Sequence, residues 1–292
     1  MHRRTFLAGL AVALAPLHAQ AQPSPDERLN LANKRLAEIE ERQGGRLGAF
    51  VLDTGTGASI AHRADERFPM CSTFKLLAAA AALKRVEEGV EHLDLAIAYR
   101  PSDLLDYAPI TKAHVAEGAM TLAALCAAAI DWSDNTAANL VLQSIGGPPG
   151  FTAFARSLGD NVTRLDRNEP SLNEATPGDP RDTTSPRAMA GDMQKVLLGD
   201  ALSEASRLQL QTWLVGDKVG DKRLRAGLPA SWRIGDKTGS GERGSTNTIA
   251  IIWAPERAPL IATVYYTESS APMDARNAIH KEIGGLIAET FS

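Results

Sequence analysis

The residues best suited to chemistry lie in the stretch 68–75, which reads Phe-Pro-Met-Cys-Ser-Thr-Phe-Lys. Ser72 and Lys75 open an alanine-rich apolar run, residues 76–83, whose composition favours a buried helix. Because residues at i and i+3 share a helix face, the Ser72 hydroxyl and the Lys75 amine are predicted to point the same way. A hydroxyl beside an amine at a helix N-terminus, where free backbone N–H groups favour negative charge, is typical of an activated nucleophile and its oxyanion site.

A serine and a lysine at this spacing also occur at ordinary helix starts, but three further stretches of the chain support the catalytic interpretation. Residues 133–135, Ser-Asp-Asn, follow an apolar run that is typical of a buried helix. Residues 169–173, Glu-Pro-Ser-Leu-Asn, lie in a proline-rich polar segment that has the character of an Ω loop. Residues 237–239, Lys-Thr-Gly, follow a strand-like run that begins at Arg233. Each alone is common capping, turn or strand-end chemistry; in this order the four indicate one catalytic site.

The elements that position these residues alternate between sheet-like ends and a helical middle. Ser24, Pro25 and Glu27 form a capping box that starts a helix ending at the glycines 44 and 45. A hairpin, residues 47–52 and 58–62, follows it. Apolar runs within 76–214 are helical in pattern. Strand-like runs return at 233–236, 248–253 and 260–266, before a closing amphipathic helix at 273–291.

These elements predict a combined α/β and all-α fold. A lone hairpin is unstable, so it is expected to join the three late strands in a five-stranded antiparallel sheet covered by the N- and C-terminal helices. We expect an α/β domain of residues 22–63 plus 215–292, and an inserted all-α domain of residues 64–214. The active site is expected in the cleft between these two lobes, where small-molecule sites tend to lie.

The composition is that of an ordinary globular protein, with 292 residues, 44% of them hydrophobic and 23% charged. A formal charge of −4 without a basic patch disfavours nucleic acid as a partner. No cluster has metal-ligand spacing, so we expect neither a metal nor a cofactor. A monomer is expected.

Residues 1–21 have the features of a signal peptide. Arg3 and Arg4 precede an apolar run too short to span a bilayer, and Ala-Gln-Ala closes the segment. The paired arginines followed by Phe6 and Leu7 favour the twin-arginine route, with a general secretory signal as the alternative. We therefore predict a periplasmic protein that has no membrane contact once the signal is removed.

The four motifs together resemble those of the class A serine β-lactamases, within the penicillin-recognising serine enzymes, and the match covers essentially all of the mature chain. The resemblance implies the two-lobed fold described above. It also implies hydrolysis of the β-lactam amide of penicillins and cephalosporins through a serine acyl-enzyme, and hence antibiotic resistance.

The resemblance also implies roles for single residues. Ser72 would be the nucleophile, and the backbone N–H groups of Ser72 and Ser240 would form the oxyanion hole. Lys75 would help to move the serine proton, although Lys75 and Glu169 both remain candidates for the acylation base. Ser133 would pass a proton to the leaving nitrogen, and Glu169 with Asn173 would hold the hydrolytic water. The residues expected to bind substrate are Asn135, Asn173, Lys237, Thr238, Gly239 and Ser240. An ion pair between Arg167 and Asp182 would close the loop that carries Glu169.

Two positions, 246 and 241, depart from common family patterns. Thr246 stands where many members carry a carboxylate-binding arginine; Arg223 matches a position that supplies it in other members, or else is a solvated charge. Gly241 stands where some members pair a cysteine with the position of Cys71, which lowers the expectation of strong carbapenem hydrolysis. Cys71 followed by Thr-Gly-Ser at 238–240 resembles members with broad cephalosporin activity. We expect Cys71 and Cys126 to be free, buried and hydrophobic in character, although an exported protein could pair them.

Three other classes of protein share parts of this chemistry. A penicillin-binding D,D-peptidase uses similar serine and lysine motifs but lacks the water-activating pair Glu169 and Asn173, which favours hydrolysis here. A β-lactam sensor domain would need a membrane-spanning partner segment, and the chain has no second long apolar run. An unrelated serine hydrolase would need a Ser-His-Asp set, and no histidine falls in any motif.

Overall fold

The computed structural model describes residues 24–292, so the predicted signal peptide at 1–21 lies outside the described residues. The strands are β1 (Arg46–Asp53), β2 (Ser59–His62), β3 (Phe68–Pro69), β4 (Ala96–Ala98), β5 (Ala119–Thr121), β6 (Thr183–Thr184), β7 (Arg233–Ser240), β8 (Thr246–Trp253) and β9 (Leu260–Thr267). The helices are α1 (Pro25–Gln43), α2 (Lys75–Glu87), α3 (Pro109–Ala113), α4 (Leu122–Asp131), α5 (Asn135–Ser144), α6 (Gly147–Ser157), α7 (Pro186–Leu197), α8 (Glu204–Val215), α9 (Leu224–Gly227) and α10 (Met273–Phe291).

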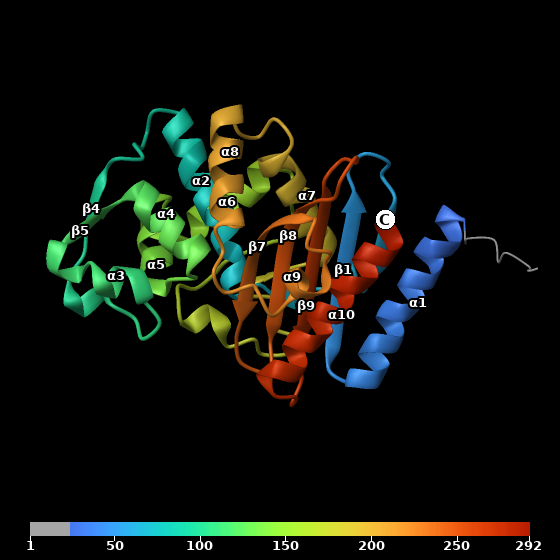
Figure 1. Ribbon diagram of the computed structural model, residues 1–292. Helices are drawn as coiled ribbons and strands as arrows, with labels where there is room; N and C mark the ends of the chain where they lie inside the picture. Colours follow the sequence, from blue (N-terminus) through green and yellow to red (C-terminus); the bar gives the residue numbers. More distant parts are fainter. Residues whose placement is uncertain (1–23) are drawn as a thin grey trace, which may run out of the picture.

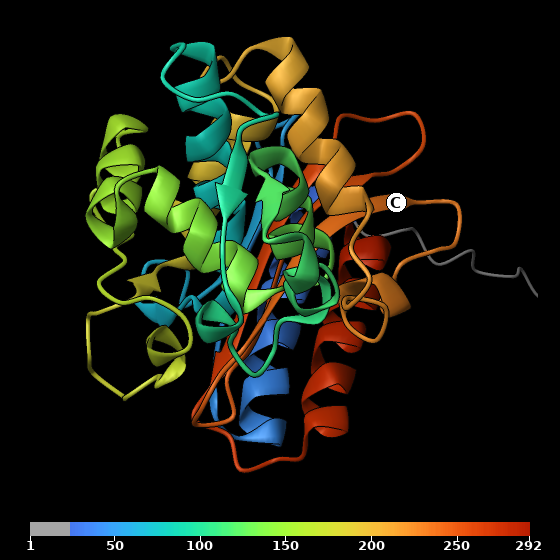
Figure 2. The same ribbon diagram turned by 90° about the vertical axis from the view of Figure 1, so that its left-hand side faces the viewer.

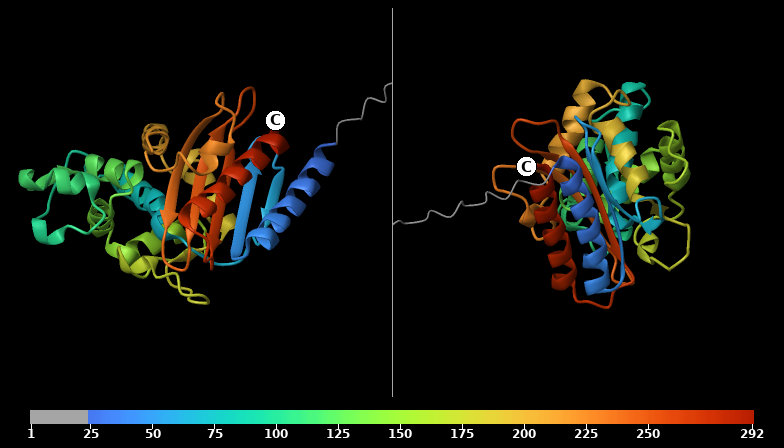
Figure 3. Two further views of the ribbon diagram at one scale, coloured as in Figure 1. Left: turned by 60° about the horizontal axis from the view of Figure 1, so that its bottom comes forward. Right: turned by 90° about the vertical axis from the view of Figure 1, so that its right-hand side faces the viewer.

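The predicted five-stranded sheet is present, and its order, β2-β1-β9-β8-β7, joins the two ends of the described chain. Every neighbouring pair of strands is antiparallel. Strands β1 and β9 pair over eight residues, from Arg46 opposite Thr267 to Asp53 opposite Leu260. Helices α1 and α10 lie side by side on one face of the sheet, and the helical part of the chain lies beyond β7 (Figures 1 and 3). The prediction for fold class is confirmed.

The core follows the two-residue period of the strands, because successive side chains point to opposite faces. Ala250 and Ile252 of β8 pack with α1 and α10 in one apolar cluster. Ile249 and Ile251 point the other way, into a larger cluster that continues through the helices between β2 and β7. The sheet is therefore buried on both faces, and its second face forms the floor on which the helical lobe sits. The domain limits given above, 22–63 plus 215–292 and 64–214, stay a prediction.

Some helices and strands end where the local sequence predicts, and others end where tertiary contacts place them. The capping box of α1 is present, with Ser24 and Glu27 bonded reciprocally, and α10 has the predicted bounds. Two predictions were wrong. Strand β7 does not stop at residue 236 but continues to Ser240, because pairing with β8 extends through Ser240 opposite Thr246. Helix α6 starts at Gly147 rather than 151, since prolines are tolerated in a first helical turn.

No helix within residues 24–292 is long and apolar enough to cross a membrane.

Candidate active site

Ser72 lies on a tight turn that joins β3 to α2. The turn is a 3-10 helix, Cys71–Phe74, rather than the first turn of the α-helix that the sequence predicts. Cys71 has a positive φ of 45°, a conformation that is costly for a residue with a side chain. Asn247 of β8 holds the approach to the turn, since its Nδ2 donates to the carbonyls of Pro69 (2.9 Å) and Met70 (3.0 Å). Neighbouring strands thus impose the geometry of the nucleophile.

Strand β7 approaches this turn so closely that only a glycine fits at residue 239. A Cβ on Gly239 would lie 2.9 Å from the Met70 carbonyl oxygen and 3.2 Å from the Ser72 backbone nitrogen. The end of β7, with Ser240, is therefore held against the nucleophile turn. The two backbone N–H groups predicted for the oxyanion hole come from these two adjoining segments.

Lys75 is buried and its ammonium group is surrounded by oxygen atoms. Nζ donates to the Ser133 carbonyl (2.8 Å) and to Asn135 Oδ1 (2.6 Å), and it lies 3.1 Å from Glu169 Oε1. Burial lowers the pKa of Lys75, and the charge of Glu169 opposes this shift. No direct hydrogen bond joins Lys75 to Ser72 in the described structure. Ser72 Oγ instead donates to Glu169 Oε1 at 3.1 Å, so Glu169 bridges the two.

Glu169 is held in place from both sides. Its backbone N–H donates to Asn139 Oδ1, and Asn139 Nδ2 donates to its carbonyl, both at 2.9 Å. Asn173 Nδ2 donates to the second carboxylate oxygen, Oε2. The carboxylate side chain is fully buried, and these bonds leave it little freedom of orientation.

The segment 166–182, here called the Glu169 loop, is closed by ion pairs and stands out from the helical lobe (Figure 2). Arg167 Nε lies 2.6 Å from Asp182 Oδ2, which is the ion pair that the family resemblance implies. Asp182 is almost fully buried and also accepts the backbone N–H of Asp166 and of Arg167. The start and the end of the loop are therefore joined at one carboxylate.

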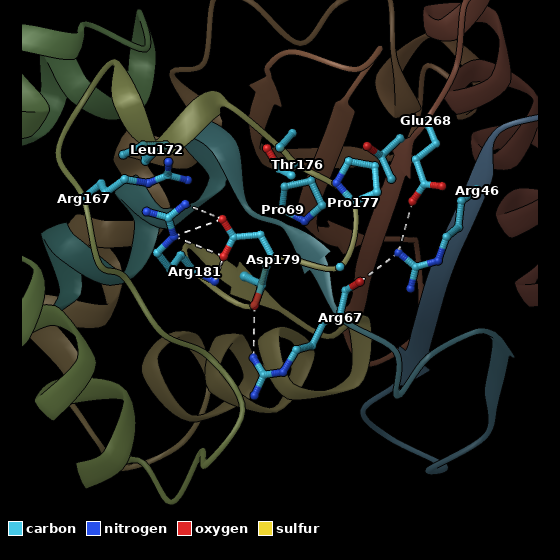
Figure 4. Close-up of a pocket in the computed structure, with 14 residues that line it drawn as sticks. Arg46, Arg67, Pro69, Arg167, Leu172, Thr176, Pro177, Asp179, Arg181 and Glu268 are labelled. Atoms are coloured by element: carbon cyan, nitrogen blue, oxygen red, sulfur yellow. Dashed lines mark hydrogen bonds and ion pairs between the residues drawn. The ribbon is translucent and has the colours of Figure 1, made fainter.

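A pocket beside the Glu169 loop is lined by four arginines, each of which contacts oxygen atoms of the protein; Figure 4 shows contacts of Arg46, Arg67 and Arg181. Arg181 binds Asp179 within the loop, at 2.6 Å. Arg46 of β1 lies 3.8 Å from Glu268, which follows β9. Arg67 donates to the Val162 carbonyl and to Thr183 Oγ1. The contacts of Arg167 and Arg181 therefore lie within the loop, and those of Arg67 join residues that precede and follow it.

Lys237 and Ser133 meet across the two lobes. Lys237 is fully buried, and its Nζ donates to Ser133 Oγ (3.0 Å) and to the Thr238 carbonyl (2.8 Å). Burial, and then the positive charge of Lys75, lower the pKa of Lys237 to about 7. The Lys237 amine is therefore held beside the hydroxyl that is predicted to protonate the leaving nitrogen.

Arg223 is not a solvated charge. It is only 6% exposed, and its guanidinium donates to the carbonyls of Gly239 (2.8 Å) and Asn247 (2.7 Å) and to Ser240 Oγ (2.7 Å). Its fourth bond is to the amide oxygen of Asn277. Burial lowers the pKa of Arg223 to about 10. No carboxylate in residues 24–292 lies within 4.0 Å of this guanidinium, so a buried cation faces the cleft without an ion-pair partner.

These groups line one cleft between the lobes, of about 300 Å³. Its walls are Ser72, Tyr107, Ser133, Asn135, Asn173, Val219, Arg223, Thr238, Gly239 and Ser240. Lys75, Glu169 and Lys237 are bonded directly to this wall. The structure thus brings together every site residue predicted from the sequence.

Four residues of the site were missed by sequence reasoning. Asn139 lies one helical turn after Asn135 on α5, and that spacing was the available signal. Asn247, Tyr107 and Val219 have no local motif, since they reach the site through sheet pairing and loop placement.

Cys71 and Cys126 are both free and buried, as expected, and burial raises the pKa of each thiol to about 12. A Cβ on Gly241 would lie 2.7 Å from Cys71 Sγ. Cys71 therefore forms no disulfide with position 241, where the resemblance considers one.

Comparison with known proteins gives one consistent family. A family model described as the β-lactamase enzyme family matches residues 31–291. The chain is 50% identical to β-lactamase CTX-M-8 of Citrobacter amalonaticus over 98% of this chain and 96% of that protein. It is 47% identical to β-lactamase Toho-1 of Escherichia coli, over 99% and 98%. Among solved structures, an ancestral (GNCA) class A β-lactamase has a TM-score of 0.88 and 63% identity, covering 89% of this chain and all of that one. A putative class A β-lactamase, PenP, from Rhodopseudomonas palustris has a TM-score of 0.88 and 56% identity.

Proposed function

The chain belongs to the β-lactamase enzyme family, as a class A serine enzyme that hydrolyses the β-lactam amide of penicillins and cephalosporins and confers resistance to them, and from this we propose how its cleft performs the reaction. The observation that carries the proposal is the position of Glu169 Oε1, which is 3.1 Å from both Ser72 Oγ and Lys75 Nζ. One carboxylate can therefore serve the nucleophile in both halves of the reaction.

In acylation, Ser72 Oγ attacks the lactam carbonyl and Glu169 accepts the serine proton. Two arguments favour Glu169 over Lys75 as the base. The Ser72 hydroxyl already donates to Glu169. Lys75 has four acceptor atoms within reach, two from Ser133 and one each from Asn135 and Glu169, so all three N–H donors of an ammonium group are engaged and no lone pair is left for a proton.

The negative charge that develops on the lactam oxygen is stabilised by the backbone N–H groups of Ser72 and Ser240. The close packing of Gly239 on the nucleophile turn supports this assignment, because it fixes the spacing of the two segments. The leaving nitrogen receives its proton from Ser133 Oγ. Lys237, 3.0 Å from that oxygen, favours the transfer by stabilising negative charge on Ser133. The proton that Glu169 accepted returns to Ser133 through Lys75 Nζ, which lies 3.1 Å from Glu169 Oε1 and 3.4 Å from Ser133 Oγ, so Glu169 is ionised again before deacylation.

The substrate carboxylate binds where β7 presents Lys237, Thr238 and Ser240, and we propose that Arg223 adds to its affinity. Arg223 bonds Ser240 Oγ and has no carboxylate of its own among the described residues, so a bound carboxylate would supply the missing counter-charge. Asn135, on the facing wall of the cleft, binds the side-chain amide of the substrate.

Deacylation separates this proposal from the runner-up, a D,D-peptidase, whose acyl-enzyme would persist. Glu169, with Asn173 bonded to its Oε2, activates the water that hydrolyses the ester. Intact-protein mass spectrometry during reaction with excess benzylpenicillin tests this directly. We expect the mass to return to that of the free protein while penicilloate accumulates. A lasting penicilloyl adduct on Ser72 would support Ser72 as the nucleophile but refute the role of Glu169 in deacylation.

We propose a broad cephalosporin spectrum with slow carbapenem turnover. Support comes from the Thr-Gly-Ser sequence at 238–240 beside Cys71, and from Cys71 being free. The ratio of kcat/KM for an oxyimino-cephalosporin to that for a carbapenem tests it, and a ratio near one would contradict it.

Export to the periplasm by the twin-arginine route is likewise proposed from the sequence. We also propose that the mature enzyme is a monomer. Replacing Arg3 and Arg4 together by lysine should retain the enzyme in the cytoplasm. Continued export of that variant would indicate the general secretory route. Light scattering of the purified mature enzyme measures the oligomeric state.

A further inference from the structure

Two buried aspartates near Lys237 have no part in the reaction described so far. Asp236 precedes Lys237 on β7 and is fully buried, and Asp217, in the segment after α8, is 4% exposed. Arg225 donates to Oδ1 of Asp236 at 2.5 Å, and the backbone N–H of Val219 donates to Oδ1 of Asp217 at 3.3 Å. The second oxygen of each carboxylate, Oδ2, is buried and has no hydrogen-bond partner within the described part of the chain.

These two oxygens converge on Gly220. A Cβ on Gly220 would lie 2.1 Å from Oδ2 of Asp236 and 2.4 Å from Oδ2 of Asp217. The oxygens are therefore no farther apart than the sum of these distances, about 4.5 Å. An ionised carboxylate has acceptors only, so two of them facing each other away from water repel unless one carries a proton. Burial, and then the charge of Asp217, raise the pKa of Asp236, in agreement with a proton held there.

Lys237 directly follows Asp236 on β7, and it lacks a direct counter-charge. Its Nζ bonds two neutral oxygens, of Ser133 and Thr238, and no carboxylate of residues 24–292 lies within 4.0 Å of it. A fully buried ammonium group without negative charge nearby loses its proton readily. The charges of Asp217 and Asp236 both favour the cationic form of Lys237.

We propose that Asp217 and Asp236 share one proton, and that the single negative charge they retain keeps Lys237 cationic and so fit to bind the substrate carboxylate. The pair acts as a positioning unit through Lys237, and the inference rests on the role proposed above for that lysine. Arg225 binds the outer oxygen of Asp236 and is itself near Asp221. The other charged groups around the pair and Lys237 are Asp131, Lys218, Arg223 and Lys75.

The alkaline limb of kcat/KM for benzylpenicillin tests this, because it reports ionisation of essential groups in the free enzyme. An asparagine at residue 236 is neutral, like a protonated carboxyl, and can donate an N–H to Asp217. We therefore expect Asp236→Asn to keep the limb midpoint within about 0.5 pH unit of the parent. The double variant Asp217→Asn/Asp236→Asn carries no charge, and its midpoint should fall by about one pH unit or more.

The matched control is Asp221→Asn, which removes an exposed carboxylate from the same segment and should leave the midpoint in place. Lys237→Arg separates the role of Lys237 from its dependence on the aspartate pair. Arginine stays charged throughout the pH range measured and should abolish the alkaline limb of kcat/KM. A limb that survives in Lys237→Arg refutes both the role of Lys237 and the inference. A limb lost in Lys237→Arg but unmoved in the double variant overturns the inference alone. A full shift in Asp236→Asn would show that the pair carries two charges, which also overturns it.

A second measurement does not depend on the double variant folding. The infrared difference spectrum between the parent and Asp236→Asn at pH 7 should contain the C=O stretch of a protonated carboxyl group. The absence of that band would mean that the pair holds no proton, and would overturn the proposal. Circular dichroism and thermal unfolding establish that each variant compared is folded.

Discussion

Replacing Glu169 by alanine removes a carboxylate that contacts both Ser72 Oγ and Lys75 Nζ at 3.1 Å. Opposite unit charges at this separation attract by on the order of 5 kcal/mol at an effective dielectric constant of about 20. The variant leaves the buried Lys75 without this partner, so the pKa of Lys75, already lowered by burial, falls further. A neutral Lys75 can then take the proton of Ser72, and we expect acylation to continue at a reduced rate.

Deacylation has no such substitute, because no other carboxylate in the described structure is bonded to the nucleophile. We expect its rate to fall by about 10²–10⁴-fold, the usual contribution of a general base. Rapid mixing with benzylpenicillin followed by intact-protein mass spectrometry should show an adduct that forms and persists. Glu174→Ala, which removes a half-exposed carboxylate of the same loop, is the matched control and should turn over normally. If Glu169→Ala clears substrate at the parent rate without an adduct, the reasoning is wrong.

Three further predictions concern charge and loop closure. Arg223→Ala should raise KM for benzylpenicillin about tenfold or more with little change in kcat, because a charge-assisted bond to the substrate is lost. Replacement of the exposed neighbour, Lys222→Ala, should leave KM unchanged. Equal KM values for both variants would exclude Arg223 from the site. Burial, and then the charge of Asp160, raise the pKa of Asp192 to about 9. The native state therefore keeps a proton on Asp192 that the unfolded chain loses above the ordinary aspartate pKa of about 4. Between these two pH values the free energy of unfolding falls by up to about 1.4 kcal/mol per pH unit. Asp192→Asn should therefore raise the free energy of unfolding at pH 8 but not at pH 3.5, as measured by denaturant titration; no gain at pH 8 would contradict this. Arg167→Ala should lower kcat and speed amide hydrogen exchange across residues 166–182, since Asp182 loses its buried partner; unchanged exchange would mean that other contacts close the loop.

Sequence reasoning succeeded where the signal is local. The capping box at Ser24 determines where α1 begins, and the apolar face of α10 determines its extent. The active-site serines, lysines and Glu169 were found because each belongs to a short motif whose chemistry needs fixed neighbours. The sheet followed from a physical requirement, since the N-terminal hairpin had to find partners.

Features that depend on distant contacts could not be found in this way. Residues 237–240 have weak strand propensity, and their strand conformation is imposed by pairing with β8. The 3-10 turn at Ser72 is held by Asn247, which lies in a different part of the chain. The pair Asp217 and Asp236 is joined by the close approach of Gly220, and nothing in its local sequence distinguishes it from solvated acidic residues.

The pairing of β1 with β9 also governs when the enzyme can form during synthesis. Residues 46–53 must wait for residues 260–267 before the sheet can close, and contacts so distant in sequence form slowly, after loop closure has cost entropy. Until then β1 exposes an unpaired apolar edge on the ribosome. Because the nucleophile turn is held by Asn247 of β8, a chain released early has no assembled site. β-Lactam resistance therefore begins only after nearly the whole polypeptide has emerged, and premature termination anywhere before β9 yields an inactive product that is prone to aggregation.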